Sequence, residues 1–152
     1  MPTSNANLSI LSIPAYYVLA FLPHLYANYV ASHGDLGSLE YSSPRSAKHI
    51  EGIKKNLSPE RYARFERAKA ASLNAYENAP LLVGAVLASH LAGVDKAHVD
   101  SFAVRFLLMR AAHSVIYIVT PGPKYYQVRS TCWLISMYLS FSILYEAAVK
   151  LA

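Results

Sequence analysis

The sequence predicts an all-α integral membrane protein, a bundle of four transmembrane helices in a single domain of residues 1–152. Hydrophobic residues make up 54% and charged residues 15% of the chain, whereas typical soluble domains carry roughly 25% charged residues. The charges are also clustered, because four long spans contain none: 1–34, 78–94, 111–123 and 130–145. A transmembrane helix needs ~20 residues. The shorter spans reach that length only by including an ionisable residue such as Glu77, Arg110 or Arg129.

The first helix is expected over about residues 8–30, interrupted by Pro14 and Pro23. It is expected to be retained, since it lacks the positive n-region of a signal peptide and its apolar run is too long. His24 and Asn28 are four residues apart and share a face, which is expected to meet other helices. The connection 32–58 mixes glycines with both charge signs and is expected to be exposed and partly irregular.

The second helix is expected over 59–91, with Ser58 as its cap and Pro59 at its first position. It is longer than the bilayer core, so its first turns should project into the cytosol. Gly93 is typical of a helix stop. A short connection, 94–99, leads to a third helix over about 100–119, and a Pro- and Gly-rich break precedes a fourth over about 125–151.

The formal charge of +5 lies mostly in residues 45–69. There is no basic stripe with interleaved aromatics, so nucleic acid is not an expected partner. Juxtamembrane contacts with anionic membrane lipids explain the charge better. The distribution of Lys and Arg places the first and third connections in the cytosol and both termini in the lumen. The single cysteine, Cys132, excludes an intramolecular disulfide and is interpreted as a small buried hydrophobe. No metal site is expected.

Ionisable residues inside a membrane are functional candidates by default. Arg67, Asn74 and Glu77 fall near one stripe of the second helix. In the predicted topology Arg67 lies roughly in one leaflet with residues of the other helices: Arg110, His113 and Tyr117 on one face of the third, and Arg129 with Ser130 on the fourth. Arginine binds carboxylates through paired hydrogen bonds and favours a nearby thiolate. Glutathione, with two carboxylates, one amine and one thiol, fits such a site. Alternatively, Glu77 pairs with one arginine to fix packing, Tyr117 belongs to an interfacial belt, and His113 bonds between helices.

The order and spacing of these residues resemble the MAPEG family, the membrane-associated proteins in eicosanoid and glutathione metabolism. The resemblance is carried by Glu66-Arg67, Asn74, Glu77 and Pro80, then RAAHSVIY at 110–117, VRS at 128–130 and YEAAVKL at 145–151. It is nearest the branch of microsomal prostaglandin E synthase and microsomal glutathione transferase. The resemblance implies a homotrimer in the endoplasmic reticulum membrane, with glutathione bound between subunits near the cytosolic side.

The resemblance also implies roles for individual residues. Arg129 would activate the thiol, with Ser130 and Tyr117 as further catalytic residues. The glutathione-binding set would be Arg67, Asn74, Glu77, Arg110, His113, Tyr117, Arg129 and Trp133. The chain departs from the family at Ala70, where an arginine is usual, and the adjacent Lys69 is expected to point about 100° away. The basic residue at the end of the first helix is also absent, and His49 stands where the prostaglandin synthase branch has an Asp.

Three functions follow. The first is a glutathione-dependent transferase, peroxidase or isomerase that acts on a lipophilic small molecule. The second is a glutathione-independent isomerase or cyclase on the same scaffold, in which Arg129, His113 and Tyr117 supply general acid or oxyanion stabilisation. The third is a non-catalytic lipid-binding partner of another membrane protein.

Overall fold

A computed structural model describes residues 6–122 and 125–152. Its elements are α1 (Leu8–Ala31), η1 (Leu36–Ser38), α2 (Ala47–Asn56), α3 (Pro59–Leu91), α4 (Lys96–Val119) and α5 (Tyr126–Leu151). Three of them, α1, α4 and α5, are long and apolar enough to cross a membrane. Helix α3 is long enough but too polar, because Asn74, Glu77 and Asn78 interrupt its apolar half. The described residues are all-α, and a fourth crossing by α3 stays a prediction.

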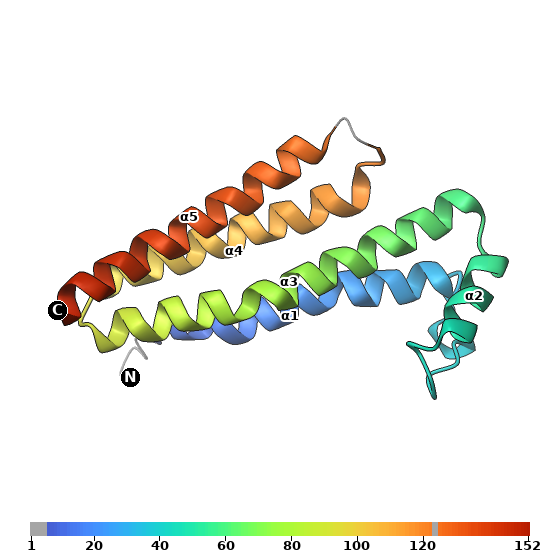
Figure 1. The fold of residues 1–152 in the computed structure, drawn as a ribbon. Coiled ribbons are helices and arrows are strands. Elements are labelled where there is room, and N and C mark those ends of the chain that lie inside the picture. The colour runs from blue at the N-terminus through green and yellow to red at the C-terminus, as the bar shows by residue number, and fades with distance from the viewer. Residues whose placement is uncertain (1–5, 123–124) are drawn as a thin grey trace.

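The four long helices form two pairs. Figure 1 shows α1 lying along α3 and α4 along α5, with α2 beside the end of α1 and α3. The start of α1 and the end of α5 lie at the opposite end of the bundle, next to the α3–α4 connection. The helices approach closely because many buried positions are alanine, a feature of helix packing in membranes. Aromatic and branched side chains fill the remaining core: Tyr16, Leu82, Val86, Val99, Phe102 and Phe106.

Most helix ends follow local sequence signals. The Ser58 side chain accepts a hydrogen bond from the Arg61 amide, and Pro59 opens α3. Gly93 takes a positive φ of 66° just after α3, and the amide of Val94 bonds back into the last turn. Helix α4 starts at Lys96 and not at residue 100, because the Asp95 side chain caps it by accepting from the His98 amide. The expected connection 94–99 is therefore mostly helical.

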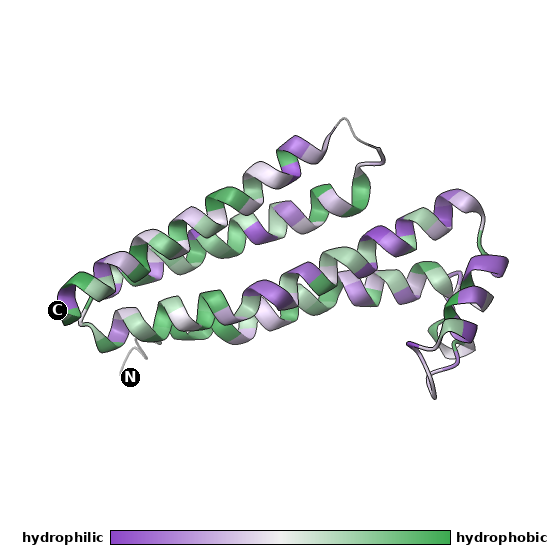
Figure 2. Ribbon diagram, in the orientation of Figure 1, coloured by the Kyte–Doolittle hydropathy of each residue, from purple (hydrophilic) through white to green (hydrophobic). Residues whose placement is uncertain are grey.

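The first connection contains an unexpected helix. The Ser46 side chain accepts from the His49 amide and starts α2. Ile53 and Leu57 are buried in a small cluster with residues of α1 and α3. Figure 2 shows that α2 and the start of α3 are largely hydrophilic, in contrast to the apolar halves of the bundle. Ile50, Ile53 and Leu57 follow the helical period after Ser46, but the sequence analysis interpreted this glycine-containing, charged segment as a connection and missed the helix.

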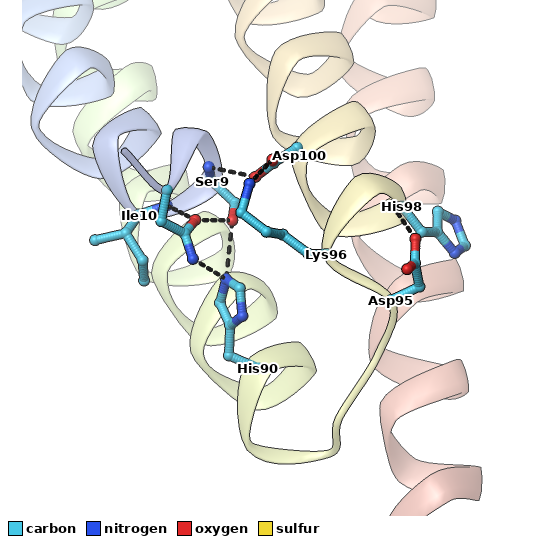
Figure 3. Close-up of polar contacts among 8 residues, drawn as sticks. Ser9, Ile10, His90, Asp95, Lys96, His98 and Asp100 are labelled. Carbon is cyan, nitrogen blue, oxygen red and sulfur yellow. Dashed lines mark hydrogen bonds and ion pairs between the residues drawn. The ribbon is translucent and has the colours of Figure 1, made fainter. Parts of the chain in front are cut away.

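A polar network ties three helices together at the end that holds the termini (Figure 3). The backbone amide of Ser9 donates to Asp100 Oδ1 at 2.8 Å, and Lys96 contacts the other carboxylate oxygen at 2.6 Å. The Ser9 hydroxyl lies 2.9 Å from His90 Nε2. These contacts join the starts of α1 and α4 to the end of α3. They therefore fix the positions of these helices, which carry the candidate site, relative to one another along the bundle axis.

Candidate functional site

Arg110 is the centre of a buried polar cluster that joins three helices. Its side chain is fully buried in the core. One terminal nitrogen, Nη2, donates to Asn74 Oδ1 at 2.6 Å and to the Asn74 carbonyl at 3.2 Å. Its Nε donates to the hydroxyl of Tyr16 at 3.2 Å. That hydroxyl in turn donates to the carbonyl of Ala75 at 2.8 Å. Arg110 on α4 is thus held by α1 and α3 of the same chain.

Tyr16 is a site residue that sequence reasoning did not find. It lies in the middle of α1 and is 1% exposed. The one available signal was its place between Pro14 and Pro23, deep in an apolar span. A tyrosine of the interfacial belt would lie near a membrane surface instead.

A second group of site residues lies closer to the α4–α5 connection. The ring of His113, which is buried, meets the edge of the Tyr117 ring with 5.8 Å between centroids. The guanidinium carbon of Arg129 lies 4.0 Å from the Tyr117 centroid. Cation–π contact of this kind holds a guanidinium in place and leaves its hydrogen-bond donors free. Ser130 and Trp133 follow on α5 and are half-buried.

Arg67 has a structural partner. Its Nε donates to the carbonyl of Ile118 at 3.0 Å. Ile118 lies in the last turn of α4, where carbonyls lack helical partners and cations are favoured. Arg67 therefore joins the foot of α3 to the end of α4, beside the Tyr117 and Arg129 pair.

Glu77 does not join this cluster. It is exposed on α3 and makes no ion pair with any residue that the structure describes. At 3.6 residues per turn it lies about 60° around the helix from Asn74. Its pairing with an arginine, one of the alternatives from the sequence, does not occur within the described part of this chain.

The cluster carries unbalanced charge and unused hydrogen-bonding groups. Across residues 6–122 and 125–152, no carboxylate lies within 4.0 Å of the Arg67, Arg110 or Arg129 side chains. Three buried polar atoms on α4 also lack hydrogen-bond partners in that part of the chain: Arg110 Nη1, His113 Nδ1 and Ser114 Oγ. Each unmet donor or acceptor costs about 1–3 kcal/mol. A polar, anionic molecule or a polar group from another copy of the chain is the kind of partner that would meet these needs.

A separate cavity of about 820 Å³ lies between α1, α3 and residues 39–53. Its walls combine aromatic side chains with polar ones, among them His24, Arg45 and Lys69. Lys69 and Ala70 both line it, so the expected angle of about 100° between them around α3 does not keep them out of the same cavity. Lys69 Nζ lies 3.4 Å from His24 Nδ1, and His24 Nε2 lies 3.3 Å from the Asn28 amide nitrogen, on the shared face expected from the sequence.

Comparison with known proteins identifies a family for the chain. No curated protein and no solved structure matches the chain. The model of the MAPEG family matches residues 13–149, which is nearly the whole chain and includes every candidate site residue. Together with three helices long and apolar enough to cross a bilayer, this match makes the protein a membrane protein. The chain belongs to the MAPEG family.

Proposed function

We propose that this chain is a glutathione-dependent membrane enzyme, a transferase, peroxidase or isomerase that acts on a lipophilic substrate. Members of the MAPEG family commonly use glutathione as a substrate or cofactor. The observation that carries the proposal is the placement of Arg129. Its guanidinium rests on the face of Tyr117, next to Ser130, and has no carboxylate partner among the described residues. A held and unneutralised guanidinium is suited to stabilising an anion.

In this proposal, bound glutathione supplies the thiol nucleophile. Arg129 lowers the free energy of the thiolate relative to the thiol, which raises the fraction of the reactive form at neutral pH. Tyr117 keeps the guanidinium in position through its ring. The Ser130 hydroxyl, one residue further along α5, is a second hydrogen-bond donor for the sulfur. Trp133 lies one turn beyond and adds apolar surface on the same side of α5.

Other residues hold the peptide in this proposal. Asn74 is half-buried, and its Oδ1 accepts a hydrogen bond from Arg110, which fixes the orientation of the side-chain amide. Because Arg110 is itself fully buried, it acts as a positioning residue for Asn74. The Nδ1 of His113 is buried and has no hydrogen-bond partner in the described part of the chain, so a polar group of the bound peptide would satisfy it. Arg67 fixes the position of the end of α4, and therefore of Tyr117, along the axis of the bundle.

Glu77 supports an assembly of several chains. An ionised carboxylate that faces lipid is costly, and Glu77 has no partner in the described part of its own chain. We therefore propose a homotrimer in which Glu77 faces a site shared with the adjacent subunit, where it binds the ammonium group of glutathione. We place the trimer in the endoplasmic reticulum membrane, with the site toward the cytosol, where the basic first connection lies.

A glutathione-independent isomerase or cyclase is the second candidate. Ala70 favours it, because an arginine that would bind a glutathione carboxylate is missing there. The pair of His113 and Tyr117 also favours it, since a buried imidazole beside a phenol can move a proton without a thiol.

The test is glutathione binding to the detergent-purified protein by calorimetry, with thiolate formation followed by ultraviolet absorbance. Arg129→Ala is expected to lower the thiolate fraction at least about tenfold, since one charge-assisted hydrogen bond is worth about 1.5–3 kcal/mol. Arg129→Lys should retain part of it. Arg105→Ala, an exposed arginine on α4 bonded to its own helix, is the matched control and should change nothing. Absence of binding at millimolar glutathione, with the wild-type protein folded, would favour the glutathione-independent reaction.

A further inference from the structure

We infer that the amine of Lys69 is the reactive group of a second site, the cavity between α1, α3 and residues 39–53, where it forms an imine with an aldehyde or a ketone. The inference goes beyond the proposed function, because this reaction uses an amine of the protein and needs no thiol. Three observations carry it: the partly enclosed position of Lys69, the absence of a carboxylate partner for it, and the direction of its hydrogen bond with His24.

Lys69 lies where an ammonium group is poorly stabilised. Its side chain is half-buried and lines the cavity of about 820 Å³. Phe21, Phe65 and Tyr76 provide aromatic walls. Loss of hydration disfavours the charged form of an amine, and only the neutral form has the lone pair that attacks a carbonyl carbon. The cavity is also large enough to hold a small carbonyl compound beside the amine.

No neighbouring carboxylate stabilises the charge of Lys69. It makes no ion pair with any residue that the structure describes. The other titratable or charged side chains of the lining are His24, Glu40, Tyr41, Arg45, His49 and Tyr76. Arg45 is close enough to act on the charge of Lys69, and a second cation disfavours the ammonium further. Glu40 is engaged elsewhere, because it accepts a hydrogen bond from the Ser42 amide at 2.9 Å.

The contacts of His24 match a neutral amine. The side-chain amide nitrogen of Asn28 donates to His24 Nε2 at 3.3 Å, which leaves the proton of a neutral imidazole on Nδ1. That Nδ1 lies 3.4 Å from Lys69 Nζ. An ammonium group has three donors and no acceptor, whereas a neutral amine accepts the Nδ1 proton. Asn28 and His24 are therefore positioning residues that favour the nucleophilic form of Lys69.

The reaction balances within the cavity. The Lys69 nitrogen attacks the carbonyl carbon, and the carbonyl oxygen becomes the hydroxyl group of a carbinolamine. The carbon–oxygen bond then breaks as the carbon–nitrogen double bond forms, and the two amine hydrogens leave with the oxygen as one molecule of water. No atom is oxidised or reduced. The His24 ring, 3.4 Å from the nitrogen, is placed to carry a proton from nitrogen to oxygen.

The test is reductive trapping on the detergent-purified full chain without glutathione. Benzaldehyde is the carbonyl probe, sodium cyanoborohydride reduces the imine to a stable benzylamine, and peptide mass spectrometry locates the label. Lys55 is the control in the same sample, since it is exposed and paired with Glu51. We expect Lys69 to be labelled about tenfold or more faster than Lys55 at pH 7, where an exposed lysine is neutral in only about one molecule in 2,500. The rate at Lys69 should saturate with benzaldehyde and should level off at a lower pH than the rate at Lys55.

Matched variants test the positioning residues. Arg45→Gln removes the nearby cation. Asn28→Asp offers His24 Nε2 only acceptors, so the ring proton moves to Nε2 and the free Nδ1 favours the ammonium form of Lys69. Each variant should slow the labelling of Lys69 about threefold or more and move its pH profile upward. Lys48→Gln removes a cation that is three residues from Arg45 and does not line the cavity, so it should change neither.

Three results would overturn the inference: equal labelling of Lys69 and Lys55, a rate at Lys69 that stays linear in benzaldehyde, or equal effects of Arg45→Gln and Lys48→Gln. Thiolate formation with glutathione, measured on the same variants, separates this inference from the proposed function. Arg129→Ala should lower thiolate formation and leave the labelling of Lys69 unchanged, whereas Arg45→Gln should do the reverse.

Discussion

Removal of one hydroxyl group tests whether the Arg110 cluster holds the bundle together. In Tyr16→Phe the ring keeps its packing against Phe106, but two hydrogen bonds disappear. The carbonyl of Ala75 loses its side-chain donor, and Arg110 Nε loses its acceptor. Both groups are then buried in a core that excludes water.

The magnitude follows from these two bonds. A neutral hydrogen bond between transmembrane helices is worth on average about 0.6 kcal/mol. A hydrogen bond to a charged group is worth about 1.5–3 kcal/mol, and a buried charged donor without an acceptor lies at the upper end. We therefore expect Tyr16→Phe to lower the free energy of unfolding by about 2–4 kcal/mol. Tyr17→Phe changes the adjacent, exposed residue of the same helix and should cost about 0.5 kcal/mol or less.

The assay is reversible unfolding in mixed micelles with increasing dodecyl sulfate, followed by circular dichroism. A double-mutant cycle isolates the charged bond: in the Arg110→Met background, where a hydrophobe replaces the buried charge, Tyr16→Phe should cost only the neutral part. The coupling energy between the two sites should be about 1.5–3 kcal/mol. Equal costs for Tyr16→Phe and Tyr17→Phe, or a coupling near zero, would refute the view that Tyr16 supports Arg110.

Two further predictions concern helix ends. Arg67→Ala removes the hydrogen bond to the Ile118 carbonyl and should speed amide hydrogen exchange in the last turn of α4 by about fivefold to tenfold, since the bond is worth about 1–1.5 kcal/mol. Arg64 is exposed on the same helix, so Arg64→Ala should leave the exchange rate unchanged. Equal exchange in both variants would contradict the role of Arg67. Gly93→Ala should destabilise the chain by about 1 kcal/mol because φ is 66° at this position. Gly84 lies within a helix, and a methyl group added there meets open space. Gly84→Ala should therefore stabilise the chain by about 0.5–1 kcal/mol in the same unfolding assay. Identical signs for the two glycines would show that backbone conformation does not decide the effect.

Helix ends with strong local chemistry were predictable from the sequence. Ser58, Pro59 and Gly93 act within one or two turns, so their effect does not depend on the rest of the fold. The caps at Ser46 and Asp95 use the same chemistry, and an apolar period follows each: Ile50, Ile53 and Leu57 after Ser46, and Val99, Phe102 and Phe106 after Asp95. Helix α2 and the first turn of α4 were missed because these two caps were not recognised in segments interpreted as connections.

The candidate site was predictable only in part. The predicted topology places Arg110 and Asn74 at a similar depth in the membrane. Their direct contact, and the role of Tyr16 in it, depend on how three helices pack. Helical period alone places Lys69 100° from Ala70. The structure places both on the wall of one cavity, because residues 39–53 close a space wide enough to span that angle. Glu77 lies about 60° around α3 from Asn74 and is exposed in the single chain, so its role in a site between subunits stays a prediction.

Helix α3 separates the two candidate sites within one chain. Arg67 and Lys69 are two residues apart, so they point about 200° apart around the helix. The first contacts α4, and the second lines the cavity beside α1. A helix with its side chains is about 10 Å thick, so α3 stands between the cavity and Arg129 of the same chain. The proposed trimer removes this obstacle if α5 of one copy lies beside the cavity of the next.

That geometry has a direct consequence for mixed assemblies. If each reaction site takes Lys69 from one copy and Arg129 from its neighbour, a trimer that contains both Lys69→Met and Arg129→Ala chains also contains sites with both residues intact. Co-expression of the two variants with different affinity tags, and purification through both tags, should therefore restore part of the activity toward a lipophilic substrate that each variant lacks alone. If both residues came from one chain, every site in the mixed trimer would keep one defect. Activity no greater than that of the single variants would then show that the two sites do not meet across an interface.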